Sequence, residues 1–198
     1  MTRTKLLGAL LAILGYHATA QATQLINNTG LASPSQVLTF SEVVLPSESL
    51  VTNQYAGFGV TFSPGMFYNT QPVFFPTPSL ANFNFSGGLS NPSSILFSQD
   101  LTEVALAVQT NPGTTTFSAL LDNIVVESFT TGTTLNQASN FYGFTNIVFD
   151  EIRILSNTTF FQMDNLQLSP SSVPEPGTLA LLGLGLAGLF VPKRRTRA

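Results

Sequence analysis

The side chains that most often perform catalysis are scarce in this chain. Its 198 residues include no cysteine and a single histidine, His17, which lies in an N-terminal segment that we expect to be removed. The remaining chain then has no imidazole base, no Ser–His or Cys–His pair and no ordinary zinc site. A pair of carboxylates could still hydrolyse a glycoside, but the acidic residues are scattered singly. We therefore expect a protein that is not an enzyme, and a glycosidase is the least favoured alternative.

The charged residues are distributed unevenly along the chain. Arg3 and Lys5 stand near the N-terminus and four of the seven Lys and Arg residues follow residue 192, so Arg153 is the only cation between them. The stretch 21–168 also holds nine of the ten acidic residues, which gives it a net charge of −8. An acidic body of this kind repels phosphate backbones, and the composition therefore excludes nucleic acid as a partner.

The first 20 residues have the three parts of a signal peptide. Arg3 and Lys5 form its basic region, residues 6–14 form its apolar region, and Ala18 and Ala20 supply the small side chains of the cleavage site. We expect a signal helix that directs the chain to the Sec export machinery, with cleavage after Ala20 or, alternatively, after Ala22. A retained N-terminal anchor is the other interpretation.

The last 25 residues, 174–198, have an equally ordered composition. An apolar run at 179–191 lies between the sequence Pro174-Glu175-Pro176 and a basic cluster that contains Lys193, Arg194 and Arg195. The run is shorter than the roughly 20 residues of an ordinary span, but a short transmembrane helix can insert where the bilayer thins. The basic cluster should stay on the cytoplasmic side, which leaves the preceding chain outside the membrane.

These three ordered parts resemble the PEP-CTERM sorting signal of exported proteins in Gram-negative bacteria that make exopolysaccharide. The resemblance implies that an exosortase in the inner membrane recognises Pro174, Glu175 and Pro176, while Lys193, Arg194 and Arg195 retain the tail until it is removed. It also implies transient anchoring in the inner membrane, followed by release to the cell surface or the extracellular biofilm matrix. The alternative is a plain C-terminal membrane anchor.

Between the two signals, the pattern is that of β-strands. Short apolar runs rich in Val, Ile, Phe and Thr alternate with Gly, Pro, Asn and Ser, and no helical stripe is visible. We predict an all-β fold, an antiparallel two-sheet sandwich of the jelly-roll kind at 21–168, followed by a linker at 169–173. Asp122 and Asn123 predict a two-residue hairpin turn. The expected strands are 36–44, 59–63, 94–97, 103–109, 114–121, 124–129, 146–155 and 160–168.

Segments 38–42, 51–63 and 161–168 resemble other exosortase-sorted surface proteins, which are similar to carbohydrate-binding jelly rolls. The resemblance implies that the first and last strands pair and that a Ca²⁺ ion can lie beside them. Asp164 has the parity of the inward-facing Leu166 and Leu168, so its carboxylate needs a partner. Arg153, backbone amides at a turn, and a Ca²⁺ ion shared with Glu42 are the three candidates.

A sugar site is suggested by aromatic residues among Asn and Gln in two stretches that we expect to be loops, 66–75 and 140–142. Tyr68, Phe75 and Tyr142 are the candidate glycan contacts. The alternative is that these rings close the ends of the core, because the chain has 17 Phe residues to bury. The sequence thus predicts a non-enzymatic protein of the cell surface or exopolysaccharide matrix, and a lectin-like module is the alternative.

Overall fold

The computed structural model describes residues 22–72, 74–75, 78–136 and 139–170. The predicted signal helix and the predicted C-terminal transmembrane helix both lie outside these residues. Within the described part of the chain, no helix is long and apolar enough to cross a membrane.

The described residues form an all-β, antiparallel structure with a single short 3₁₀ helix, η1 (Ala56–Phe58). The fold class predicted from the sequence is therefore confirmed. The strands are β1 (Thr23–Asn27), β2 (Gln36–Leu38), β3 (Leu50–Val51), β4 (Val60–Ser63), β5 (Met66–Asn69), β6 (Ser79–Ala81), β7 (Ser93–Thr110), β8 (Gly113–Leu121), β9 (Ile124–Thr133), β10 (Phe141–Ser156) and β11 (Phe161–Pro170).

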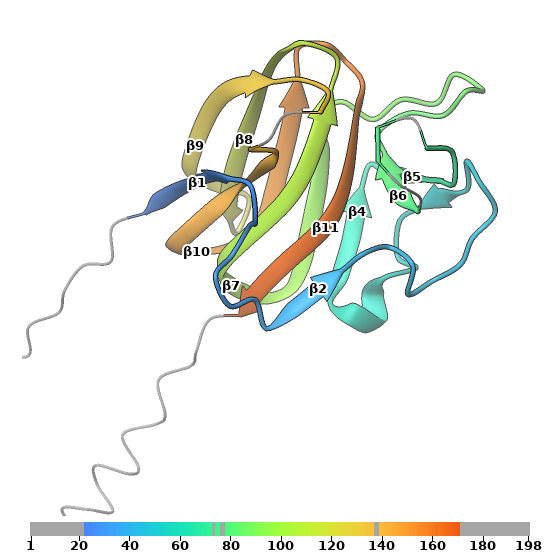
Figure 1. Cartoon of the computed structure of the whole chain (residues 1–198). Helices are drawn as coiled ribbons and strands as arrows, with labels where there is room; N and C mark the ends of the chain where they lie inside the picture. Colours follow the sequence, from blue (N-terminus) through green and yellow to red (C-terminus); the bar gives the residue numbers. More distant parts are fainter. Residues whose placement is uncertain (1–21, 73, 76–77, 137–138, 171–198) are drawn as a thin grey trace, which may run out of the picture.

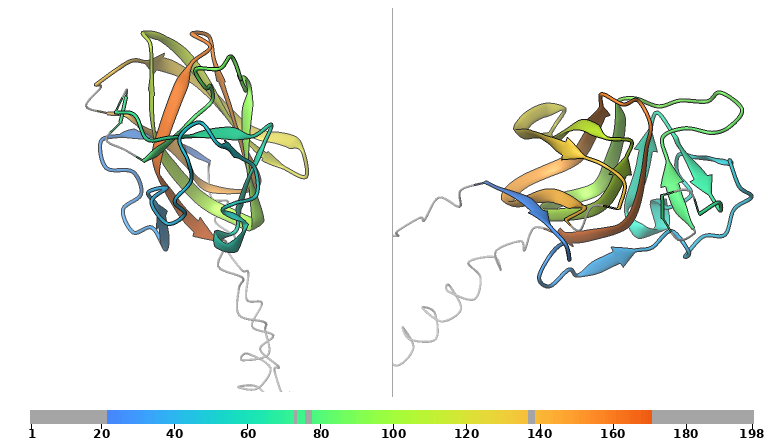
Figure 2. Two further views of the ribbon diagram at one scale, coloured as in Figure 1. Left: turned by 90° about the vertical axis from the view of Figure 1, so that its right-hand side faces the viewer. Right: turned by 45° about the horizontal axis from the view of Figure 1, so that its top comes forward.

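Two long strands hold the layers of the sandwich together. The strand order is β3-β5-β6-β11-β7-β10-β8-β9, and β1, β2 and β4 pair with β10, β11 and β7 respectively. The first half of β10 pairs with β1 and its second half pairs with β8, while β7 runs along it over almost its whole length. Irregularities around Phe149 interrupt the register of β10 on β7, as expected where a strand bends. The layers are thus joined by continuous hydrogen bonding and curl around one core (Figures 1 and 2).

The closest approach between strands in the middle of the sheet depends on Gly143 in β10. A Cβ atom at this position would lie 1.8 Å from the carbonyl oxygen of Val104 in β7, far inside van der Waals contact. Only glycine allows the two backbones to lie so close together.

Aromatic side chains fill much of the core. The ring of Phe117 in β8 stacks on the ring of Tyr142 in β10, with centroids 4.8 Å apart, and on the ring of Phe129 in β9, with centroids 5.3 Å apart. Phe129 in turn meets Phe144 edge to face. All these rings are buried, and each fully buried large apolar side chain contributes about 1.5–3 kcal/mol to folding.

Most predicted strands are present, with shifted ends. The turn at Asp122 and Asn123 is confirmed, because both residues have positive φ between β8 and β9, as a type I′ hairpin requires. The expected pairing of early and late strands is present as well, with Leu38 of β2 opposite Leu166 of β11. The predicted strand 36–44 is wrong beyond Leu38, because Phe40 has a φ of 60° that a strand cannot accommodate.

Two further differences concern strand continuity. The predicted strands 94–97 and 103–109 are parts of the single strand β7, because the backbone stays in strand conformation through residues 98–102 although Ser98 and Asp100 favour a turn. The predicted linker begins too early, because Ser169 and Pro170 still belong to β11, where they pair with Glu103 and Leu101 of β7.

Candidate functional site

The three rings predicted from the sequence to contact a glycan, those of Tyr68, Phe75 and Tyr142, are buried. Tyr142 lies on β10 and Tyr68 on β5, in segments expected to be loops, and Phe75 is only 6% exposed. Burial raises the pKa of Tyr68 and of Tyr142. The prediction that these residues form an exposed sugar platform is wrong as the chain is folded, because strand alternation turns Tyr68 and Tyr142 toward the core.

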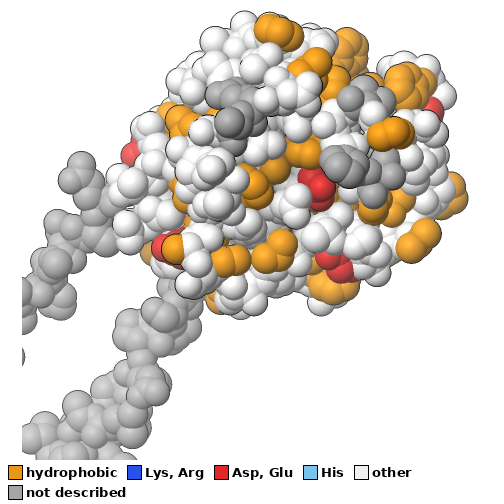
Figure 3. Space-filling view, in the orientation of Figure 1, with side chains coloured by type: hydrophobic (Ala, Val, Ile, Leu, Met, Phe, Trp, Pro, Cys, Tyr) orange, Lys and Arg blue, Asp and Glu red, His pale blue; other side chains and the backbone are white. Residues whose placement is uncertain are grey.

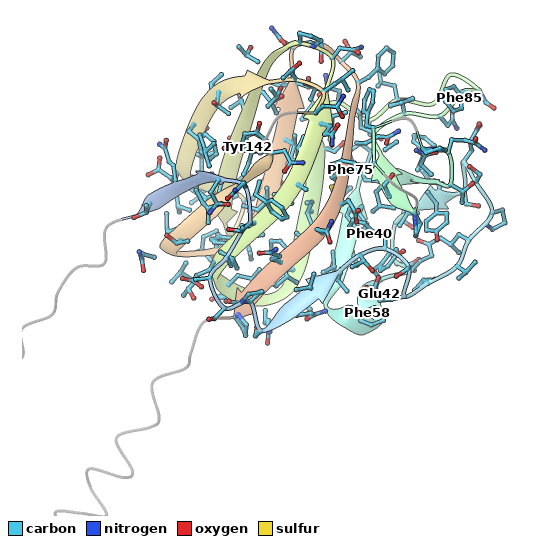
Figure 4. All side chains as sticks on the ribbon, viewed as in Figure 1. Phe40, Glu42, Phe58, Phe75, Phe85 and Tyr142 are labelled. Carbon is cyan, nitrogen blue, oxygen red and sulfur yellow. The ribbon has the colours of Figure 1, made fainter. Side chains whose placement is uncertain are left out.

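A different set of aromatic residues forms an exposed groove, which we call the aromatic groove. It has a volume of about 360 Å³ and is lined by Phe74, Phe83, Asn84, Phe85, Asn111 and Phe160. These residues come from the connections β5–β6, β6–β7, β7–β8 and β10–β11, which therefore meet at one end of the sandwich. Phe85 is 66% exposed and Phe160 is 41% exposed, and Figure 4 shows Phe85 on a loop that projects from the body.

The rings of the aromatic groove hold one another in place. Phe83 is the central ring, because it meets Phe160 edge to face at 5.0 Å and Phe85 edge to face at 5.9 Å. Edge-to-face pairs at these distances are attractive beyond their area of contact. The exposed rings are therefore positioned before any ligand arrives.

Asn82 connects the loops that carry these rings. It is fully buried, and its side-chain amide donates hydrogen bonds to the carbonyl oxygens of Ser90 (3.0 Å) and Thr159 (2.6 Å). Its side-chain oxygen accepts a hydrogen bond from the backbone N–H of Phe161 at 2.7 Å. Because Asn82 precedes Phe83 and Phe161 follows Phe160, this one side chain fixes the two loops relative to each other.

Phe74 is tied to the body in a similar way. The buried side chain of Gln162 on β11 accepts hydrogen bonds from the backbone N–H of Phe74 (3.4 Å) and from the hydroxyl of Ser79 (3.5 Å). The loops that carry Phe74, Phe83 and Phe160 are thus attached to β11 or to the residues next to it.

The aromatic groove also presents two amide side chains. Asn84 accepts a hydrogen bond from the backbone N–H of Gly88 at 2.6 Å, which orients its carboxamide and leaves its NH₂ group without a partner among the described residues. The side chain of Asn111 is exposed and has no hydrogen-bond partner within the described part of the chain. Both amides are therefore available to hydroxyl groups of a ligand.

Among the described residues, no ionisable side chain lines the aromatic groove. Glu48 lines a neighbouring hollow that shares Phe83, Asn84 and Phe85 with the groove. Its carboxylate accepts a hydrogen bond from the hydroxyl of Ser86 at 3.3 Å. The described face in Figure 3 has acidic side chains and no Lys or Arg. The surroundings are therefore unfavourable for an anionic ligand, and the groove itself is neutral.

Asp164 faces inward as predicted, and its side chain is 8% exposed. It lies beside a bulge in the pairing of β11 with β7, where Asn165 has a φ of 50°. The backbone N–H of Asn165 donates a hydrogen bond to Oδ1 of Asp164 at 2.6 Å. Of the three predicted partners, the backbone amide is the one present. Arg153 as partner is wrong, because its guanidinium pairs with Glu151 at 2.8 Å.

Glu42 lies close enough to influence Asp164. Burial raises the pKa of Asp164 to about 6, the Asn165 amide opposes this rise, and the charge of Glu42 adds to it. Glu42 itself accepts hydrogen bonds from the backbone N–H and hydroxyl of Thr39. Within the described residues, no cluster of three or more acidic or other metal-binding side chains occurs.

A Ca²⁺ site at Glu42 and Asp164 therefore stays a prediction, in which these two carboxylates are the charged ligands of the ion. A Ca²⁺ titration checks it, because an ion that binds only the folded state raises the melting temperature. A rise that disappears in Asp164→Asn would establish the site, and an unchanged melting temperature would discard it.

The predicted sorting and cleavage residues lie outside the described residues. They are Ala18, Ala20, Pro174, Glu175, Pro176, Lys193, Arg194 and Arg195. Residues 172–195 match the model of the PEP-CTERM protein-sorting motif. Comparison with curated protein sequences gives no match. This motif implies an exported protein that an exosortase processes at the membrane. The chain that carries it is therefore an exosortase-targeted exported protein.

Proposed function

We propose that the protein is a non-enzymatic component of the cell surface or of the exopolysaccharide matrix. The single observation that carries this proposal is the sorting motif at 172–195, which follows a compact β-sandwich body and complements the signal peptide predicted at the other end. The Sec machinery exports the chain, the C-terminal segment holds it in the inner membrane, and an exosortase releases the body.

The chemistry of the exported chain supports a role without catalysis. After removal of residues 1–20, the sequence contains neither histidine nor cysteine, and the lining of the aromatic groove contains no acid or base. General acid–base catalysis and covalent catalysis both require such groups. A glycosidase would require two carboxylates in a cleft, roughly 5 to 9.5 Å apart.

Processing is tested by expressing the chain in cells with and without an exosortase. We expect the intact C-terminal segment in membranes of cells that lack the exosortase, and a shortened body outside the inner membrane where the enzyme is present. Mass spectrometry of the C-terminal peptide distinguishes the two forms.

Glu175→Ala should block this shortening, whereas Thr114→Ala, an exposed residue on β8, should be processed normally. A chain that is shortened equally with and without exosortase would contradict the proposal.

A second candidate function, compatible with the first in one protein, is a lectin-like role for the body. The aromatic groove is the observation that favours it.

A further inference from the structure

The aromatic groove places large apolar side chains in water although the fold has a well-packed aromatic core. Phe85 and Phe160 are the most exposed of its rings, and each of them contacts Phe83. Isolated exposed apolar residues need no explanation, but a fixed group of rings around a groove indicates a binding surface.

The chemistry of the groove selects its ligand. The face of an aromatic ring carries partial negative charge, and the C–H groups on the flat face of a pyranose carry partial positive charge. Unpartnered amides beside the rings can bond the hydroxyl groups at the rim of the same sugar. Phe85 and Phe160 supply the aromatic faces, and Asn84 and Asn111 supply the amides.

The charges around the aromatic groove narrow the choice of ligand further. The groove has no cation to attract carboxylate or sulfate groups, Glu48 lies in the adjoining hollow, and the body has a net charge of −8. An acidic polysaccharide would be repelled by this field, whereas a neutral chain would not.

We infer that the aromatic groove binds a neutral polysaccharide, with Phe85 and Phe160 stacking on pyranose rings and Asn84 and Asn111 bonding their hydroxyl groups. This inference deepens the proposed function and rests on it for the presence of polysaccharide around the exported body. The preformed arrangement of the rings around Phe83 reduces the entropy that binding must remove. The occupant is a glycan chain because the groove is open and assembled from the ends of several loops.

The test is affinity electrophoresis of the exported protein, purified from the producing cells, in native gels that contain a polysaccharide. Hydroxyethyl cellulose, galactomannan and dextran are the neutral probes, and alginate is the acidic probe. We expect at least one neutral polymer to retard the protein in a saturable manner, and alginate to leave its mobility unchanged.

Variants assign the binding to the groove. Phe85→Ala should weaken retardation by about tenfold, which is the loss of one stacked ring, and Phe85→Trp should restore it. Asn111→Ala should also weaken binding, because it removes an amide that bonds sugar hydroxyl groups. Phe58→Ala is the control, because Phe58 is a ring on η1 that is 38% exposed, close to the 41% of Phe160, and lies far from Phe85 in Figure 4. It should bind as the parent protein does.

Thermal unfolding of each variant separates loss of binding from loss of structure. The inference is overturned if no neutral probe retards the parent protein, if alginate alone does so, or if folded Phe85→Ala and Phe160→Ala both bind unchanged. Export and processing are measured independently. A protein that is processed but does not bind refutes only this inference, whereas one that binds but is never processed refutes only the proposed function.

Discussion

Two groups of aromatic side chains in this protein have the same chemistry and opposite environments. Phe117, Phe129 and Tyr142 lie on strands and stack in the core, whereas Phe83, Phe85 and Phe160 lie on loops and surround an open groove. In the first group, strand alternation decides that the rings are buried. In the second group, the backbone imposes no such alternation, and the rings remain at the surface. A ring on a loop is therefore a better candidate for ligand contact than a ring on a strand.

The largest expected effect comes from removing a ring of the buried group. Phe117→Ala should lower the free energy of unfolding by about 3–5 kcal/mol, because it removes buried apolar surface and leaves a cavity between Phe129 and Tyr142. Denaturant-induced unfolding measures this change. An effect below about 1 kcal/mol would show that the core stack has little importance and would remove the contrast between the groups.

Asn82→Ala should have the next largest effect, about 2–3 kcal/mol, because it leaves the carbonyl of Thr159 and the N–H of Phe161 without their partner. It should also raise hydrogen exchange at Phe161 and weaken binding in the aromatic groove, since the loops of Phe83 and Phe160 lose their connection. The core rings should be unaffected. Unchanged exchange at Phe161 would contradict the positioning role of Asn82.

The buried carboxyl of Asp164 should make stability depend on pH in a way that the buried rings cannot. Its pKa in the folded protein is about 6, above the ordinary value of an unfolded aspartate. The folded state therefore holds the proton more tightly, so the contribution of this carboxyl to stability is fully present below about pH 4 and is lost as the pH rises through 6. The fall should be on the order of 2 kcal/mol.

Asp164→Asn removes this titration, so the difference in unfolding free energy between parent and variant should change between pH 4 and pH 7. Phe117→Ala is the control, because its effect should be similar at both pH values. A parent-to-variant difference that is constant across this range would contradict the raised pKa.

The smallest expected effect on stability comes from the exposed group. Phe85→Ala should change the free energy of unfolding by less than about 0.5 kcal/mol, because its ring is largely in water and, among the rings of the described residues, contacts only Phe83. The same denaturant titration as for Phe117→Ala measures it. A loss of 2 kcal/mol or more would place Phe85 with the core and would argue against a ligand-binding role.

Much of the body could be predicted from local patterns. Alternation and turn residues indicated most of the long strands, and the positive φ of Asp122 and Asn123 follows from their type and position. The short strands β3, β5 and β6 were missed, because two to four residues give too little pattern to distinguish a strand from a loop. That omission caused the wrong assignment of Tyr68, since a ring on an unrecognised strand looks like a ring on a loop.

The aromatic groove could not be derived from spacing in the sequence. Phe74, Phe83, Asn111 and Phe160 are far apart along the chain and meet only because β6, β7 and β10 end at the same side of the body. One signal was available: Phe83 and Phe85 flank Asn84 in a stretch with Gly87 and Gly88, which is typical of a loop.

The sorting motif and the fold class of this protein can be recognised from its amino-acid sequence alone. Sorting signals are read as linear segments, so charge, apolar length and Pro174-Glu175-Pro176 are sufficient, and alternation with a period of two is sufficient for a β-fold. Which rings face water and which partner satisfies Asp164 cannot be recognised in this way. Those outcomes depend on strand order, bulges and loop packing, which bring together residues whose separation along the chain carries no information about their contact.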